Sequence, residues 1–342
     1  MNLFCFSRSF SYSILLHYGP YTSPQHTMKL PALASSALLA LSTSVTALQQ
    51  GFNYGALLED GSCAHYQNFA NRFNRAKNLA NAPGFTSARL YTSIQCGSTN
   101  APIEAIKAAL DTQTNLLLGV WGSGGQATVD NEIIALKQAA QLWPAMMKTR
   151  VVGISVGSED LYRSSPQGVA NNAGVGADAQ TIANYIKQVR TALRGTALEG
   201  KRIGHVDTWT AWVLPSSAPV IQAVDFLGHN SFPYFETTKP NAIGQAKANF
   251  DSAVGQTESV SRGKPVWVTE TGWPTRGPTS GSAVASAQNA KTYWNQVGCG
   301  ELFGKWNVWW YTLFDGNAAQ QDISFAVVNQ GPGQKFNLAC PA

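Results

Sequence analysis

Residues 151–159 read VVGISVGSE, and this stretch decides the fold. Apolar and small residues fill the run until it reaches a single carboxylate, Glu159. A short run of this kind is typical of a strand that is buried on both faces, as the strands of a parallel sheet are. Parallel neighbours need a crossover connection, which usually contains a helix. The stretch therefore predicts an α/β protein in which strands and helices alternate.

Seven further short apolar runs lie along the chain, at residues 51–55, 87–91, 115–121, 202–208, 225–234, 265–274 and 306–315. Segments of helical period separate them. The two clearest are 128–147, with a stripe of Ile133, Leu136, Ala140, Trp143 and Met147, and 178–194, with Ile182, Tyr185, Ile186, Val189 and Leu193 before a stop at Gly195. Eight β-then-α units over about 290 residues predict a single (β/α)8 TIM barrel domain, residues 48–342. A doubly wound open sheet is the alternative, but the chain lacks a dinucleotide fingerprint and a P-loop.

The first 47 residues are interpreted as a leader. Met28-Lys29, an uncharged stretch and small residues ending at Ala47 are the three parts of a secretory signal, so residues 28–47 are predicted to be a signal peptide. Residues 1–27 precede this complete signal and are interpreted as a spurious extension from an early start codon. A transmembrane helix is the alternative, disfavoured by the serines and threonines of the stretch. We expect a protein secreted to the extracellular space or the cell wall, without a membrane anchor because no hydrophobic tail follows Cys340.

The chain beyond the leader contains four cysteines, an even number that suits an oxidising compartment: Cys63, Cys96, Cys299 and Cys340. Three pairings are possible. We favour Cys63 with Cys96 and Cys299 with Cys340, because each closes a short local loop. No C-x-x-C spacing indicates zinc, and His65, His205 and His229 show no metal-binding spacing, so no metal and no cofactor are expected.

Composition excludes several classes of protein. Charged residues make up 13% and hydrophobic residues 44%, which is typical of a chain with a sizeable core rather than a disordered one. The net charge is +5 and no basic run occurs, so a nucleic-acid partner is not expected. Ten Trp, 11 Tyr and 15 Phe suit the flat apolar faces of sugars.

Two carboxylates stand at equivalent places on different predicted strands. Glu159 ends the run 151–159, and Glu270 ends PVWVTE before a Gly-Trp-Pro turn. A carboxylate directly after buried strand residues is costly unless it is paired or functional. A structural salt bridge, to Arg163 or Arg276, would explain one of them. Two at one barrel mouth indicate the pair that a retaining glycosidase needs, about 5 Å apart.

Other residues near the predicted strand ends are candidates for binding a sugar. They are Tyr91, Trp121, Asp207, Trp209, Tyr234, Trp273 and Trp309. For the aromatic ones a place in the core is the alternative. Trp309 and Trp310 are adjacent and point to opposite faces, so at least one of them must be structural.

Residues 156–163 (VGSEDLYR) and 268–274 (VTETGWP) resemble the two signature segments of glycoside hydrolase family 17. Residues 51–55, 87–91 and 204–209 are similar to other segments of its fungal cell-wall members, the glucan endo-1,3-β-glucosidases. The resemblance covers about residues 51–340. It implies a (β/α)8 barrel, retention of configuration and β-1,3-glucan as substrate, with Glu159 as acid/base and Glu270 as nucleophile. Ser158 stands where many proteins with this barrel type have Asn.

These observations together predict a secreted, monomeric enzyme that cleaves β-1,3-glucan of the fungal cell wall internally, by double displacement on two glutamates. A β-1,3-glucanosyltransferase would use the same glutamates with a second glucan as acceptor. A wall protein that binds glucan without turnover is the rival from another class. Retention of both glutamates disfavours it, because a binding module does not need them.

Overall fold

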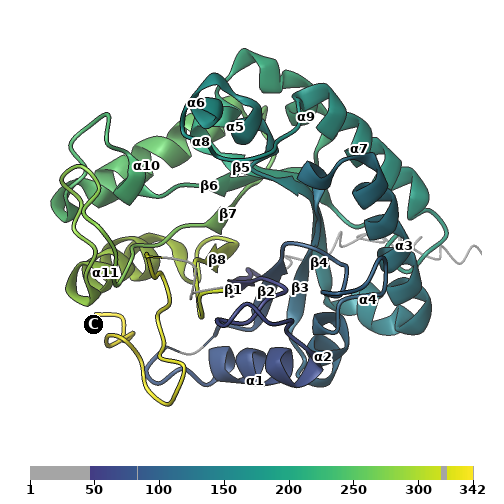
Figure 1. Ribbon diagram of the computed structural model, residues 1–342, viewed down its shortest axis with the longest axis horizontal. Helices are drawn as coiled ribbons and strands as arrows, with labels where there is room; N and C mark the ends of the chain where they lie inside the picture. The colour runs from purple at the N-terminus through teal and green to yellow at the C-terminus, as the bar shows by residue number, and fades with distance from the viewer. Residues whose placement is uncertain (1–46, 83, 317–321, 342) are drawn as a thin grey trace, which may run out of the picture. The chain divides into compact units, whose positions relative to one another are not determined.

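The computed structural model describes residues 47–82, 84–316 and 322–341. Apart from Ala47, both predicted leader segments, 1–27 and 28–47, lie outside these residues. In the described part, eight parallel strands close into a barrel in the order of the sequence, and helices surround them (Figure 1). The predicted (β/α)8 barrel is confirmed.

The strands are β1 Gln50–Tyr54, β2 Ser87–Leu90, β3 Asn115–Val120, β4 Val151–Ser158, β5 Ile203–Thr208, β6 Phe226–Asn230, β7 Val266–Glu270 and β8 Val308–Trp310. All eight predicted runs contain a strand. The last three strands end four or five residues before the predicted runs do. Pro233 and Pro274 have no N–H to give to a neighbouring strand, and Pro233 begins the 3-10 helix η3 Pro233–Phe235. The residues after these strands therefore form the loops at the mouth of the barrel.

The longer outer helices are α1 Tyr66–Lys77, α2 Ala105–Asp111, α3 Gln126–Leu142, α4 Pro144–Arg150, α7 Ala179–Ala192, α9 Ala218–Ala223, α10 Ile243–Val260 and α11 Ala287–Tyr293, which continues into the π-helix η4 Trp294–Leu302. Shorter ones lie near the mouth: η1 Gly122–Gly124, α5 Asp160–Ser164, α6 Pro166–Ala170, α8 Trp209–Trp212 and η2 Pro215–Ser217.

The helix predicted over residues 128–147 is two helices, α3 and α4. Trp143 between them has φ −134° and ψ 57°. The residue before a proline is disfavoured in helical conformation, so Pro144 ends the first helix and begins the second. The helix predicted over 178–194 is confirmed as α7, where the Asp178 side chain caps the N–H groups of Gln180 and Thr181.

Two apolar layers support the barrel. One large cluster lies between the strands and the outer helices. A small one, Leu117, Phe226, Trp267 and Trp309, comes from strands on opposite sides and fills the barrel interior near the strands' amino ends. The rings of Phe226 and Trp267 stack there with centroids 3.8 Å apart. The barrel interior is therefore closed at the amino ends of the strands. Room for a ligand remains only at their carboxyl ends.

Both favoured disulfides are present. Cys63–Cys96 joins the loop after β1 to the loop after β2, and Cys299–Cys340 joins η4 to the C-terminal segment. None of the helices in the described ranges is long and apolar enough to cross a membrane.

Candidate active site

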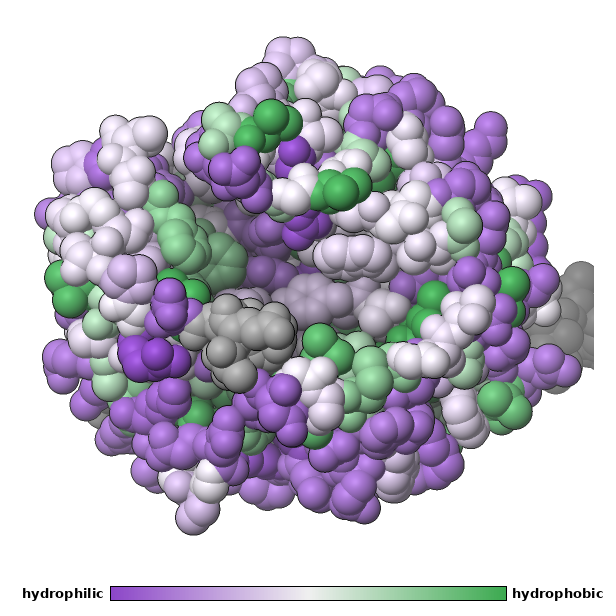
Figure 2. Space-filling model, in the orientation of Figure 1, coloured by the Kyte–Doolittle hydropathy of each residue, from purple (hydrophilic) through white to green (hydrophobic). Residues whose placement is uncertain are grey.

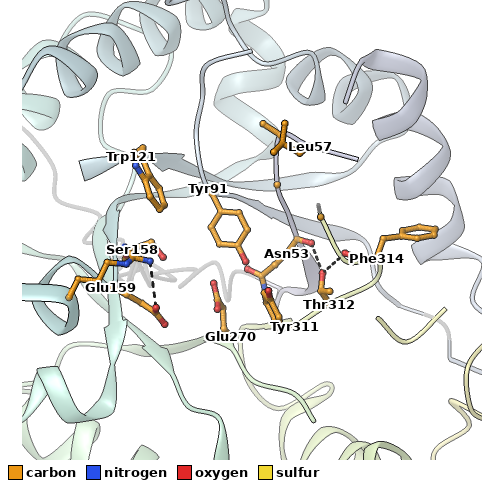
Figure 3. A pocket seen from close by; sticks show the side chains of 14 residues that line it. Asn53, Leu57, Tyr91, Trp121, Ser158, Glu159, Glu270, Tyr311, Thr312 and Phe314 are labelled. Carbon is orange, nitrogen blue, oxygen red and sulfur yellow. Dashed lines mark hydrogen bonds and ion pairs between the residues drawn. The ribbon is translucent and has the colours of Figure 1, made fainter. Parts of the chain in front are cut away.

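Glu159 and Glu270 face the same space at the carboxyl ends of the strands. Glu159 directly follows β4, and Glu270 is the last residue of β7. A cavity of about 670 Å³ and another of about 820 Å³ are both lined by these two residues and by Tyr311. The two glutamates thus stand where the cavities meet. Figure 3 shows both of them at the wall of the smaller cavity. The face of the molecule is hollowed at the barrel mouth (Figure 2).

The end of β4 is irregular in a way that places Glu159. The pairing of β4 with β5 shifts between Ser155 and Ser158, and Gly157 has φ 85°. Glu159 itself has φ 59° and ψ 25°, the left-handed conformation, which costs a non-glycine residue about 1–2 kcal/mol. Its N–H donates to the carbonyl of Val206 on β5. Strain held in this way is common at functional sites, where the surrounding structure compensates for it.

The Glu159 carboxyl is poised to give up or take a proton near neutral pH. Burial raises its pKa to about 7, and the nearby charges of Glu270 and Asp207 act in the same direction. Asn230 and Arg163 act to lower the pKa. Asn230 donates to Oε1 at 3.0 Å, and the Arg163 guanidinium lies 3.7 Å from Oε2. A carboxyl with this pKa is protonated in a large fraction of molecules at neutral pH, as a general acid must be.

The Asn230 amide is oriented by a second contact. Its carbonyl oxygen accepts the hydroxyl proton of Thr269 at 2.8 Å, which leaves the NH₂ group to face Glu159. Thr269 precedes Glu270 on β7, so one short chain of contacts runs from the strand of one glutamate to the side chain of the other.

Glu270 is held by a buried cation. Arg89 on β2 is 0% exposed, and its guanidinium donates to Glu270 Oε1 at 2.5 Å, to Asn53 Oδ1 at 2.8 Å and to Ser158 Oγ at 3.0 Å. Glu270 retains 6% exposure, toward the cavities. Such a fork-shaped donor fixes the carboxylate in position. Of the two arginines considered as partners for a structural salt bridge, Arg163 forms an ion pair with Glu159. Arg276 is exposed and bonds to the carbonyl of Asp322 instead.

Three of the aromatic candidates line the cavities. Tyr91 and Trp121 line the smaller one, and Trp209 lines the larger one. The guanidinium of Arg89 lies 4.8 Å from the Tyr91 ring centroid, and the Glu270 carboxylate adds to burial in raising the pKa of the Tyr91 hydroxyl.

The other four candidates lie away from the cavities. Trp309 is 0% exposed because it packs in the small cluster inside the barrel, where its Nε1 donates to Ser87. Tyr234 and Trp273 are buried beside each other and donate to backbone carbonyls. Asp207 is buried and bonds to backbone N–H groups and to His205. None of these side chains offers a surface to a sugar, so the expectation of substrate contact is corrected for them.

The structure also brings residues to the site that the sequence did not single out. They are Arg89 and Asn230 beside the glutamates, Tyr311 between the cavities, and Phe232 and Phe235 in the larger cavity. Phe235 is 52% exposed. The sequence could have indicated these residues only by their positions, because each lies within or just after one of the predicted strands. No three His, Cys, Asp or Glu side chains are grouped to hold a metal ion in the ranges the structure describes.

Comparisons with known proteins show which family the chain is similar to. Residues 51–327 match the model of the BtgE/BtgC glycoside hydrolase domain. The chain is 52% identical over 306 residues to a probable glucan endo-1,3-β-glucosidase of Aspergillus fumigatus, a match that covers 89% of this chain and 68% of the relative.

Solved structures of similar fold include glucan-active enzymes. A β-1,3-glucanosyltransferase of Rhizomucor miehei, assigned to glycoside hydrolase family 17, matches with 28% identity and a TM-score of 0.66 over 85% of this chain and 98% of its own. One of two plant β-glucan endohydrolases, at 17% identity and a TM-score of 0.59 over 84% of this chain and 99% of its own, shares the fold. The family expected from the two glutamate motifs is thereby confirmed. The matched region spans nearly the whole barrel and both glutamates, and the chain belongs to the BtgE/BtgC glycoside hydrolase domain family.

Proposed function

We propose that this protein is a secreted enzyme that hydrolyses internal bonds of β-1,3-glucan in the fungal cell wall with retention of configuration. The observation that carries the proposal is the pair of glutamates at the junction of two cavities, each held in a different electrostatic setting. The names of the fungal relatives support the choice of glucan. Two disulfides support an oxidising compartment such as the extracellular space.

Each glutamate has a defined part in the proposed reaction. Glu159 donates its proton to the glycosidic oxygen, while the Glu270 carboxylate attacks the anomeric carbon and the bond to the leaving sugar breaks. Glu159, now ionised, takes a proton from water, and the resulting hydroxide displaces Glu270 from the sugar. The pKa of about 7 suits Glu159 to both roles. Arg89 keeps the attacking carboxylate oriented.

The two cavities support internal cleavage. Tyr91 and Trp121 line one side of the glutamate pair, whereas Trp209, Phe232 and Phe235 line the other. A linear glucan that runs from one cavity to the other has sugars on both sides of its cleaved bond. Aromatic rings on both sides can stack on the apolar faces of those sugars.

A glucanosyltransferase is the second candidate. It is favoured by the likeness to the Rhizomucor miehei glucanosyltransferase, and by a second cavity of about 820 Å³ that has room for an acceptor chain. In that case the hydroxyl of a second glucan, rather than water, attacks the sugar bound to Glu270.

Digestion of laminarin by the purified protein tests both proposals. We expect shorter oligosaccharides whose first-formed anomer is β, as followed by NMR during the first minutes, and minor longer products at high laminarin concentration. An initial α-anomer would rule out double displacement. Products mainly longer than the substrate would identify the transferase. Glucan binding without any product from the wild-type protein would leave only a binding function.

A further inference from the structure

His205 is fully buried on β5, and both of its ring nitrogens face hydrogen-bond acceptors. Nδ1 lies 2.7 Å from the carbonyl oxygen of Val156, and Nε2 lies 2.9 Å from Oδ2 of Asp207. A carbonyl oxygen cannot donate, so Nδ1 carries a hydrogen. Whether Nε2 also carries one depends on the state of Asp207.

Both carboxyl oxygens of Asp207 face hydrogen-bond donors of the backbone. The carboxylate is 0% exposed and accepts the backbone N–H groups of Leu161 at 2.8 Å, Tyr162 at 3.2 Å and Thr208 at 2.8 Å. Because each oxygen already accepts an N–H group, Oδ2 also faces His205 Nε2 as an acceptor. A neutral imidazole would then turn a lone pair toward an acceptor. The contacts therefore favour a ring in which both nitrogens are donors, which is an imidazolium.

The charges around His205 agree with this state. Burial acts to lower the pKa of His205, but Asp207 and then Asp160 outweigh burial and raise it above its ordinary value. Asp160 on α5 is buried and accepts from Ser158 N at 2.7 Å and Ser123 Oγ at 2.6 Å.

The remaining neighbours of the ring are uncharged or face Glu159. The edge-on Trp212 lies 5.5 Å from the His205 ring centroid. On β4, a Cβ built on Gly157 would lie 2.8 Å from the His205 ring, so only a glycine lets the ring approach. Arg163, a cation whose charge acts on Asp160, binds the Ser158 carbonyl and faces Glu159.

We propose that His205 is a buried imidazolium that balances the charge of Asp207, and that the pair positions Glu159 and sets how strongly Glu159 holds its proton. The part played by Glu159 rests on the proposed function. The pair forms hydrogen bonds with the backbone on both sides of Glu159. His205 bonds to the carbonyl of Val156, and Asp207 bonds to the N–H groups of Leu161 and Tyr162. His205 and Asp207 are positioning residues, because neither lines a cavity.

The proposal predicts opposite shifts of the pH profile when His205 and Asp207 are replaced. In His205→Gln the anion of Asp207 loses its counter-charge, so the Glu159 proton is held more strongly and the basic limb of the kcat/KM profile moves to higher pH. In Asp207→Asn the anion that raises the pKa of Glu159 is gone, so the limb moves to lower pH. We expect shifts of about half a pH unit or more in each direction. A purely structural role would lower activity without opposite shifts.

NMR of the ¹⁵N-labelled wild-type protein tests the imidazolium without using activity. We expect both ring nitrogens of His205 to stay protonated from pH 5 to 8. Burial lowers the pKa of His229 to about 3, so His229 is the neutral reference in the same spectra. A His205 ring with one unprotonated nitrogen at pH 7 would overturn the proposal.

The pH profiles of both variants on laminarin complete the test, with His229→Gln as the matched control. His229 is equally buried but bonds to Thr257, so its variant should keep the wild-type limb. An unmoved limb, or shifts of the same sign in His205→Gln and Asp207→Asn, contradicts the proposal. If one variant does not fold, the direction of the shift in the other variant and the NMR spectra still test the proposal. A wild-type protein that is inactive on laminarin would instead contradict the proposed function. The NMR spectra would then still show whether His205 is an imidazolium.

Discussion

Glu159 and Glu270 carry the same functional group in opposite settings. Glu159 sits in a left-handed backbone conformation with one amide donor and a guanidinium 3.7 Å away, and burial raises its pKa to about 7. Glu270 is bonded to the buried Arg89. Such a difference supports the proposed roles of Glu159 as the acid and Glu270 as the nucleophile.

At the residue scale, Glu270→Gln should abolish hydrolysis of laminarin, with a loss of at least a thousandfold in kcat. The amide has almost the same shape, but it cannot form an ester with the anomeric carbon. Circular dichroism should show an intact fold, whereas the melting temperature should fall, because Arg89 keeps its buried charge without the partner carboxylate. A variant within tenfold of wild-type turnover would show that another residue is the nucleophile.

Glu159→Ala should slow the reaction least for substrates whose leaving group needs no proton. Added azide should restore the rate and yield a β-glycosyl azide, because azide attacks the sugar on Glu270 without general-base help. The variant should also lose the fall in activity above pH 7 that follows from deprotonation of Glu159. If azide gives no rescue and only free sugar appears, the acid/base is a different group.

At the element scale, the buried Glu132 of α3 ties two strand ends together. Its carboxylate accepts from the Thr92 hydroxyl, from Ser93 N at 2.7 Å and from Trp121 N at 3.2 Å. The first two follow β2, and Trp121 follows β3 at the wall of the smaller cavity. A helix residue thus fixes the place of an aromatic ring at the mouth.

Glu132 should also make stability depend on pH. Burial raises its pKa to about 7, against the three hydrogen bonds that lower it. A carboxyl whose pKa is raised in the folded state stabilises the fold fully at pH values below the pKa of the unfolded chain, about 4.5. This contribution is lost as the pH rises from there through the folded-state pKa of about 7. The shift corresponds to about 3 kcal/mol.

Urea unfolding at pH 4.5 and pH 8 measures this dependence. Glu132→Gln should remove about 3 kcal/mol of the wild-type change in the free energy of unfolding between the two pH values. Glu258→Gln, at an exposed position of α10, should leave the change as it is. Equal pH dependence in Glu132→Gln and the wild-type protein would contradict the raised pKa.

At the scale of the whole molecule, the two disulfides close loops of similar length at different distances from the site. They join residues 33 and 41 positions apart. Leu57, which lines the smaller cavity, forms a β-bridge with Cys63, so the first disulfide braces a cavity wall. Cys299–Cys340 joins η4 to the C-terminal segment, and none of the residues of η4 lines either cavity.

Removal of either disulfide should cost about 4 kcal/mol of stability by chain entropy, because the loops are nearly equal. Only the Cys63→Ala/Cys96→Ala protein should also show a raised KM for laminarin, at a temperature where both variants are folded. Cys299→Ala/Cys340→Ala is the matched control. Equal KM values in the two double variants would show that the first disulfide does not support the cavity.

The sequence by itself predicted the barrel, placed two glutamates at the ends of strands and favoured the cysteine pairing that the structure shows. Each rests on a local pattern: short buried runs, a carboxylate at the end of a run, or two cysteines close along the chain. The break at Trp143 was also local, since Pro144 marks it, although the apolar stripe across it suggested one helix.

Only the tertiary structure decided which side chains reach the mouth. Arg89 and Glu270 are 181 residues apart, and no local pattern pairs them. Trp309 and Tyr311 are two positions apart in the chain, yet one fills the barrel interior and the other lines both cavities, because β8 ends between them at Trp310. Asp207 points at a neighbouring backbone rather than at solvent. The direction of a side chain at a strand end depends on where the ladder stops and on the register of the next strand, and closure of the barrel sets both.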